Sequence, residues 1–108
     1  MKDASREKTI GPANRQEDYD SLYDAILQLK TRDECRRFFL DLFTPSEAMA
    51  FAERWRVACL LNEKKLSYRE IHAKTGVSVT TIGRVARFLE QEPHQGYALV
   101  LGRLKKRK

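Results

Sequence analysis

The fold is decided by residues 67–86, SYREIHAKTGVSVTTIGRVA. Ser67 and Glu70 form a capping box, because the serine hydroxyl can accept from the Glu70 backbone N–H while the Glu70 side chain reaches back. Gly76 supplies the permissive backbone that a tight turn needs after this first helix. Ser78 can then cap the helix that follows. Two short helices joined by a glycine-containing turn predict a helix-turn-helix.

The spacing of apolar residues separates an inward face from an outward face on both helices. The residues expected to pack against the core are Ile71, Ala73, Val77, Ile82 and Val85. The outward face of the second helix is small, basic and rich in hydroxyl groups, which fits the major groove of DNA. Its members are Thr80, Thr81, Gly83 and Arg84. Many all-α domains contain such a helix pair without binding DNA, so the local pattern leaves both interpretations open.

Charge favours a nucleic-acid partner. Residues 1–43 contain 8 Lys/Arg and 9 Asp/Glu, whereas residues 44–108 contain 13 and 6, which gives net charges of −1 and +7. The half with the helix-turn-helix suits a polyanion, because phosphate contacts release condensed counterions. Further DNA contacts are expected from the first helix of the motif and from its flanks, at Lys64, Lys65, Tyr68, Arg69, His72 and Lys74.

Composition excludes several classes of protein. The 108 residues are 42% hydrophobic with only five Gly and three Pro, which is typical of one small helix-rich domain. No apolar run approaches the roughly 20 residues needed to span a bilayer. The N-terminus, MKDASREK, lacks the apolar segment of a signal peptide, so we expect a cytoplasmic protein without membrane partners.

The cysteines and histidines do not form a catalytic or metal-binding pattern. Cys35 and Cys59 have no neighbouring ligand cluster and are interpreted as structural residues. His72 and His94 are isolated from any nucleophile with a carboxylate partner. We therefore expect no metal, no cofactor and no enzymatic activity.

The complete chain predicts an all-α fold of six helices. Residues 1–16 are polar and interrupted by Gly11-Pro12, which is typical of a mobile arm. A helical domain is expected over residues 17–104, with the helix-turn-helix at about 67–91, and residues 105–108 form a basic tail. The other helices are expected over residues 17–30, 31–42, 44–62 and from His94 or Gln95 to Leu104.

Two of these helices have clear start signals. Thr31 and Glu34 form a possible capping box, and Thr44-Pro45-Ser46-Glu47 combines a capping threonine with proline at the first helical position and glutamate at the third. The helix from Thr44 is apolar on many sides and is expected to be central. A core from so short a chain is marginal, which favours a homodimer that completes it.

Several pieces of the central chain match, in order, the motifs of a known family. They are Thr44-Pro45-Ser46-Glu47, Arg54, Ser67-Tyr68-Arg69-Glu70 and Thr80-Thr81-Ile82-Gly83-Arg84. The chain resembles the tryptophan repressor family, which shows a T-P-x-E opening, an arginine some ten residues on, an S-x-R-E helix and an A-T-I-T-R recognition helix. Within the family it looks closest to the YerC/YecD-type branch, and the likeness covers roughly the central half of the chain.

The resemblance implies a tryptophan-repressor-like fold in an intertwined homodimer, with two recognition helices about one DNA turn apart on an operator of two-fold symmetry. It also implies an effector pocket between the helix-turn-helix and the central helix, where two arginines sandwich the corepressor. Arg54 and Arg84 match those positions. The alternative is that they make only ion pairs or phosphate contacts, and the sequence leaves both open.

Three departures disfavour tryptophan as the effector. Val85 and Phe88 stand where tryptophan-binding members have glycine and serine, and Trp55 replaces a valine on the central helix. Phe88 cannot supply the serine hydroxyl that would bind the polar end of the amino acid. The larger side chains also add volume where an indole would enter. We expect a pocket that is filled from within or that accepts another, unknown small molecule.

The sequence therefore predicts a transcriptional regulator that binds double-stranded DNA specifically, as a repressor that occludes its operator through the helix at 79–91. The alternative is a nucleic-acid- or protein-binding module of the same fold without effector control.

Overall fold

A computed structural model describes residues 15–106, and these residues form six α-helices and no strand. The helices are α2 (Arg15–Ile26), α3 (Arg32–Leu42), α4 (Pro45–Glu63), α5 (Tyr68–Thr75), α6 (Val79–Glu90) and α7 (Gly96–Lys106). The all-α prediction is confirmed. The chain divides into two compact units at Leu42/Phe43, where the sequence had indicated one domain, and each unit is described by itself.

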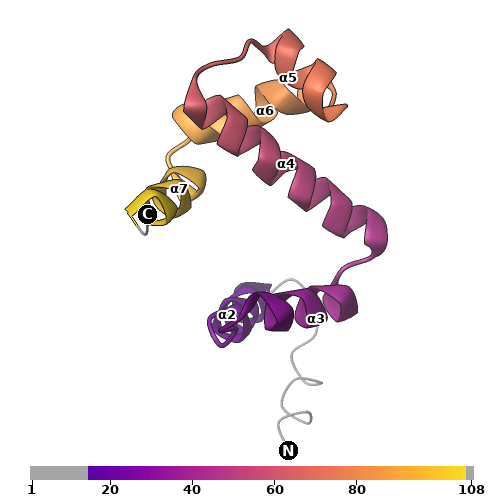
Figure 1. The fold of residues 1–108 in the computed structure, drawn as a ribbon. Helices are drawn as coiled ribbons and strands as arrows, with labels where there is room; N and C mark the ends of the chain where they lie inside the picture. The colour runs from indigo at the N-terminus through magenta and orange to yellow at the C-terminus, as the bar shows by residue number, and fades with distance from the viewer. Residues whose placement is uncertain (1–14, 107–108) are drawn as a thin grey trace, which may run out of the picture. The chain divides into compact units, whose positions relative to one another are not determined.

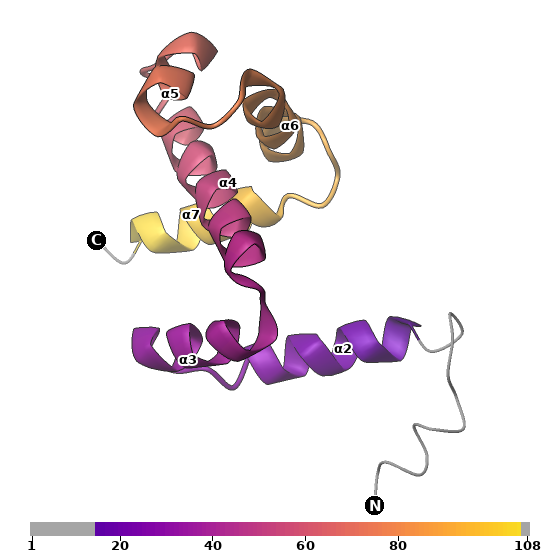
Figure 2. The ribbon, with the colours of Figure 1, turned by 90° about the vertical axis from the view of Figure 1, so that its right-hand side faces the viewer.

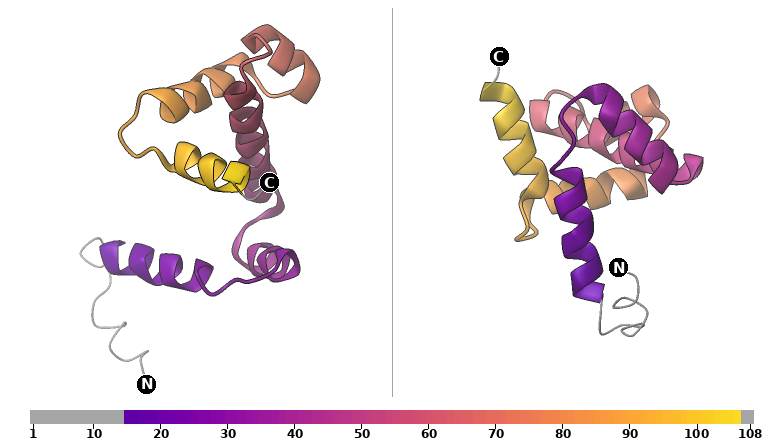
Figure 3. Two further views of the ribbon diagram at one scale, coloured as in Figure 1. Left: turned by 60° about the vertical axis from the view of Figure 1, so that its left-hand side comes forward. Right: turned by 90° about the horizontal axis from the view of Figure 1, so that it is seen from below.

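The second unit is built around α4. The short helix α5 lies beyond the C-terminal end of α4, and α6 returns to pack against both α4 and α5 (Figure 1). Helix α7 follows α6 and passes α4 in Figure 2, and α6 and α7 lie on the same side of the long helix (Figure 3, left). This order confirms the expectation that the helix opened by Thr44 is central.

Helix α6 supplies the largest share of the core. Four of the nine buried residues are on α6, three are on α4, and α5 and the turn between α5 and α6 contribute one each. They are Val57, Ala58, Leu61, Ile71, Val77, Ile82, Val85, Ala86 and Leu89. Burial of each larger side chain contributes roughly 1.5–3 kcal/mol. Because these residues come from α4, α5, α6 and the turn, the helix-turn-helix is part of the core of this unit.

Local capping fixes where the helices of this unit begin. The Thr44 hydroxyl accepts from the Glu47 N–H at 3.2 Å, and the Glu47 carboxylate accepts from the Thr44 N–H at 2.9 Å. Ser67 and Glu70 make the same reciprocal pair at 3.1 and 2.8 Å. Both predicted capping boxes are confirmed. Helix α4 ends one residue later than expected, because Lys64 adopts the left-handed conformation at its C-cap, with φ 59°.

The first unit consists of α2 and α3 joined by a short connection. Figure 1 shows α2 along its axis and α3 across the view, so the two helices form an elbow. Helix α2 ends at Ile26 rather than at Lys30, because its last turn tightens into bonds from the Gln28 and Leu29 N–H groups to carbonyls three residues back. The Thr31 hydroxyl accepts from the Glu34 N–H as predicted, but the Glu34 carboxylate accepts from the N–H of Lys30 and not from that of Thr31.

Three other expectations need correction. Arg15 and Gln16 belong to α2 rather than to an N-terminal arm, and the rest of that arm lies outside the described residues. Lys105 and Lys106 belong to α7, which begins at Gly96, so the expected tail is reduced to residues 107–108, which also lie outside. Ala73 is exposed, because two residues after buried Ile71 the helix has turned by roughly 200°.

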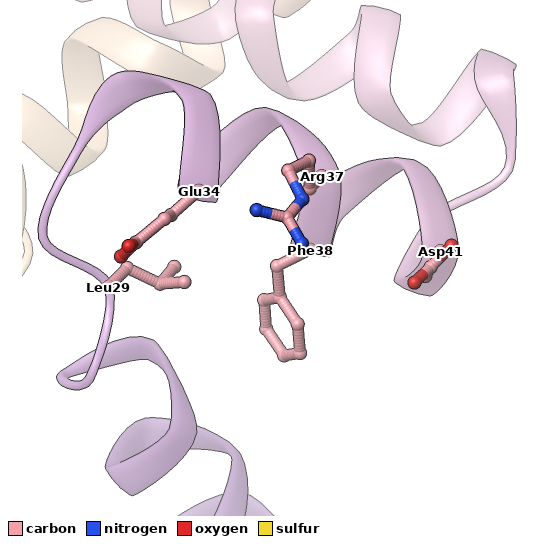
Figure 4. A pocket seen from close by; sticks show the side chains of 5 residues that line it. All are labelled: Leu29, Glu34, Arg37, Phe38 and Asp41. Carbon is pink, nitrogen blue, oxygen red and sulfur yellow. The ribbon is translucent and has the colours of Figure 1, made fainter.

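Large apolar side chains on the first unit remain exposed. Neither α2 nor α3 contains a buried residue. Tyr19 and Tyr23 stack with ring centroids 6.4 Å apart and, with Ile26 and Leu27, form an exposed stripe along α2. A second exposed site is a cavity of about 380 Å³ lined by Leu29, Glu34, Arg37, Phe38 and Asp41. Figure 4 shows the Phe38 ring pointing into open space below α3.

Candidate nucleic-acid interface

The turn between α5 and α6 sets the direction of α6. Gly76 occupies the left-handed region at φ 79°, and its N–H donates to the His72 carbonyl at 2.8 Å. Ser78 then caps α6, because its hydroxyl accepts from the Thr81 N–H at 3.1 Å. The Ser78 hydroxyl also donates to the Thr81 hydroxyl at 3.1 Å. Only three residues separate the two helices, so α6 starts in a direction that α5 determines.

Helix α6 has one buried side and one accessible side. Ile82 and Val85 are 0% and 1% exposed, as the sequence predicted. On the other side Thr80 is exposed, while Thr81 and Gly83 are partly exposed. The accessible side therefore presents hydroxyl groups and bare backbone, which are suitable for contacts to base edges.

The basic and polar candidates outside α6 are all exposed. Lys64 caps α4, Lys65 lies in the loop before α5, and the others are on α5: Tyr68, Arg69, His72 and Lys74. Tyr68 is the first residue of α5, with 43% of its surface exposed. The His72 ring makes a hydrogen bond inside the turn, which the sequence did not indicate.

Val79 is a candidate that the sequence analysis missed. It is the first residue of α6, and 51% of its surface is exposed. An apolar side chain at this end of a recognition helix can contact the methyl group of thymine. The available signal was a β-branched apolar residue next to the hydroxyl-rich face, in a position that the helical spacing places outside the core.

Arg84 is exposed on α6 and also lines a cavity. The cavity has a volume of about 220 Å³ and is lined by Arg54, Arg84, Val85, Phe88 and Tyr97. Four of these five residues were expected to share a pocket, and the structure brings them together. Tyr97 was missed, because α7 folds back on α6 over a distance that local patterns do not report.

Aromatic rings contact both arginines that line this cavity. The Arg84 guanidinium lies 4.4 Å from the centroid of the Phe88 ring, and the His94 ring stacks on Phe88 at 6.0 Å. The Arg54 guanidinium lies 4.9 Å from the centroid of Phe51. Each contact of this type contributes about 0.5–1 kcal/mol at an exposed site. The side chains of Arg54 and Arg84 therefore both lie against aromatic rings of the chain itself.

Trp55 does not line the cavity, contrary to the expectation. Its ring stacks on Tyr97 with centroids 6.3 Å apart, and it packs against the buried core. The tryptophan therefore fastens α7 to α4, and Tyr97 occupies the wall in its place.

Among residues 15–106, one cysteine has a shifted thiol pKa, and no cluster of metal-ligating side chains is present. Burial, with a smaller contribution from Glu63, raises the pKa of the Cys59 thiol, so the thiol stays protonated at neutral pH. Within residues 15–106 no group of three or more His, Cys, Asp and Glu side chains could hold a metal ion. No helix among these residues is long and apolar enough to cross a membrane.

The sequence profile of the family described as Trp repressor protein matches residues 17–105. The chain belongs to the Trp repressor protein family. It is 41% identical over 91 residues to an uncharacterized protein, YerC, of Bacillus subtilis (strain 168), covering 84% of this chain and 86% of YerC. The family is one of DNA-binding regulators, so its helix-turn-helix can be considered as a DNA-binding element.

Two solved structures of Trp repressor-like proteins resemble this one. A protein from Staphylococcus aureus assigned to the Trp repressors superimposes with a TM-score of 0.76 at 35% identity, covering 92% of both chains. A TrpR-like protein from Eubacterium eligens ATCC 27750 gives 0.78 at 38% identity, covering 86% of this chain and 94% of its own. These similarities confirm the six-helix Trp repressor fold and the predicted YerC relationship.

Proposed function

We propose that the protein is a transcriptional repressor that binds a specific, two-fold symmetric operator through α6. The observation that carries this proposal is the division of α6 into a fully buried side and an accessible side of Thr80, Thr81 and Gly83. A helix held rigidly by its buried side can present the other to the major groove without an ordering cost. Exposed basic residues at Lys64, Lys65, Arg69 and Lys74 supply phosphate contacts.

The active form is proposed to be a homodimer. Tyr19 and Tyr23 on α2 and Leu27 directly after it are 47, 53 and 76% exposed, and a contiguous exposed apolar patch of this kind marks an interaction surface. Helix α7 likewise exposes Leu99, Val100 and Leu104. A symmetric dimer buries the same surfaces on both chains and duplicates the recognition helix, so the operator acquires the same two-fold symmetry.

The test is selection of bound sequences from a random duplex library, followed by salt titration of the selected site. We expect palindromic half-sites about one DNA turn apart and a binding constant that falls steeply with salt concentration. Enrichment of no sequence, or equal binding to single-stranded RNA and duplex DNA, would instead favour the nucleic-acid- or protein-binding module. Transcription from a promoter that overlaps the selected site should then decrease when the protein is added.

L-tryptophan is not expected to act as an effector of this protein. The cavity of about 220 Å³ is smaller than the roughly 300 Å³ at which small-molecule pockets begin. Phe88 also occupies the face of the Arg84 guanidinium and offers no hydroxyl to the polar end of an amino acid. Calorimetric titration should show no saturable binding at sub-millimolar tryptophan, and operator affinity should be equal with and without it. A tryptophan-dependent gain in affinity would show that Phe88 and Val85 move aside.

Gly83→Ala is expected to separate DNA binding from stability. No atom lies within 4 Å of the position that the new methyl group would take, so the fold accepts it. A helix with alanine in place of glycine is more stable by roughly 0.5–1 kcal/mol, so the temperature of thermal unfolding should increase. Operator affinity should fall, because the methyl group enters the space where α6 approaches the bases.

Gly102→Ala is the matched control for that substitution. Gly102 is in α7, its side is equally open, and it is outside the proposed DNA-contact side of α6. Because α7 also exposes apolar side chains proposed for the dimer, sedimentation should show that this variant remains dimeric. This variant should gain similar stability and keep its operator affinity. Unchanged affinity in Gly83→Ala as well would place Gly83 outside the contact surface.

A further inference from the structure

The turn of the helix-turn-helix is held by two side chains of α5. The Thr75 hydroxyl donates to the Ile71 carbonyl at 2.7 Å and accepts from the Val77 N–H at 3.1 Å. The Nδ1 atom of His72 lies 2.7 Å from the Val77 carbonyl oxygen. Both backbone polar groups of Val77 are therefore bonded to side chains of the preceding helix, and its own side chain is buried, with 6% exposed.

This hydrogen bond determines the tautomer of His72. A carbonyl oxygen can only accept, so the hydrogen must be on Nδ1. In the neutral ring Nε2 then carries a lone pair and cannot donate to a phosphate. The arrangement disfavours the simplest function of an exposed histidine on a DNA-binding surface, which is a direct phosphate contact.

We infer that His72 is a positioning residue for DNA recognition: it locks the α5–α6 turn through Val77 and thereby fixes α6 before DNA is bound. Val77 directly precedes Ser78, which caps α6 and bonds Thr81. Loss of the His72 bond leaves the Val77 carbonyl without this partner and frees the turn. The recognition helix must then be ordered when DNA binds, which lowers affinity.

Substitutions at His72 can distinguish positioning from phosphate contact. In asparagine the amide nitrogen is two bonds from Cβ, as Nδ1 is, so His72→Asn can still donate to Val77. In glutamine the amide nitrogen is three bonds away, as Nε2 is, so His72→Gln can donate to a phosphate but not at the Nδ1 position. Asparagine and histidine have similar helix propensities, so wild type and His72→Asn are matched in the intrinsic stability of α5.

The experiment measures operator affinity for wild type, His72→Asn, His72→Gln and His72→Ala at one salt concentration. The inference predicts that Asn retains wild-type affinity, whereas Gln and Ala lose about 3- to 10-fold, the range of one net hydrogen bond. If His72→Gln retains wild-type affinity and His72→Asn loses affinity, the inference is overturned in favour of a phosphate contact. No loss in Ala would overturn any role of His72.

Two measurements without DNA test the hydrogen bond from His72 to Val77 directly. Nitrogen-15 NMR of the imidazole ring should show the Nδ1–H tautomer, and an Nε2–H tautomer would overturn the inference. Amide exchange at Val77 should accelerate in Ala and Gln but not in Asn, and equal rates in all variants would also overturn it. The affinity comparison rests on the proposed function, whereas these measurements do not. If no specific duplex is ever selected, the proposed function fails, and the NMR and exchange results still decide the state of the turn.

Discussion

Tyr23→Glu is expected to convert the proposed dimer into monomers. Tyr23 lies in the middle of the exposed stripe on α2, stacked on Tyr19, and a dimer that covers this stripe would bury the new carboxylate. An uncompensated buried charge costs about 3–5 kcal/mol, which weakens association by two to three orders of magnitude or more. Analytical ultracentrifugation should show a monomer at micromolar concentration, and operator affinity should fall because each monomer binds one half-site.

Two controls accompany the Tyr23 variant. Gln28→Glu adds the same charge at an exposed polar position of the same unit and should remain dimeric. Circular dichroism should show that the core of the second unit is retained, since α2 has no buried residue. A Tyr23→Glu protein that remains dimeric would place the stripe outside the interface.

Ile82→Ala is expected to reduce the free energy of unfolding by about 2–5 kcal/mol. Ile82 is fully buried on the first turn of α6, so the lost methyl and methylene groups leave a cavity that rigid neighbours fill only in part. Urea denaturation at a fixed protein concentration measures the change. Operator affinity should fall with it, because the side chain that anchors α6 is shortened.

Val79→Ala provides the comparison on the same helix. Val79 is also β-branched but is 51% exposed, so its effect on the free energy of unfolding should be within about 0.5 kcal/mol. Equal destabilisation by the two substitutions would contradict the division of α6 into buried and accessible sides.

The sequence predicted this protein best where the determining interactions are local. The capping boxes at Thr44 and Ser67 need partners only three residues away, and both are present. The prediction that the first helix extends to Lys30 was wrong, because the Lys30 N–H already donates to the Glu34 carboxylate of the next helix. The prediction that Ala73 is buried was wrong, because one apolar residue on a short helix does not establish which side faces the core.

The candidate site was predictable in its composition and less so in its geometry. The resemblance placed Arg54 and Arg84 in one pocket by matching positions and added Val85 and Phe88 as departures from the family pattern, and the structure gives all four one cavity. The position of Tyr97 depends on how α7 folds back after α6, and its ring stacks on Trp55 of α4, which is distant in sequence. The bond from His72 to Val77 needed the turn in three dimensions, since five residues separate the pair.

Helix α6 carries four of the nine core residues and also the accessible side of Thr80, Thr81 and Gly83. Local unfolding of this helix would therefore require the free energy of opening most of the second unit. Substitutions on this helix have two kinds of effect. Packing restricts the buried positions Ile82, Val85, Ala86 and Leu89. The accessible positions Val79, Thr80 and Gly83 can be substituted with little effect on folding. Such a chain can acquire a new operator preference by substitution at its accessible positions while its core stays the same.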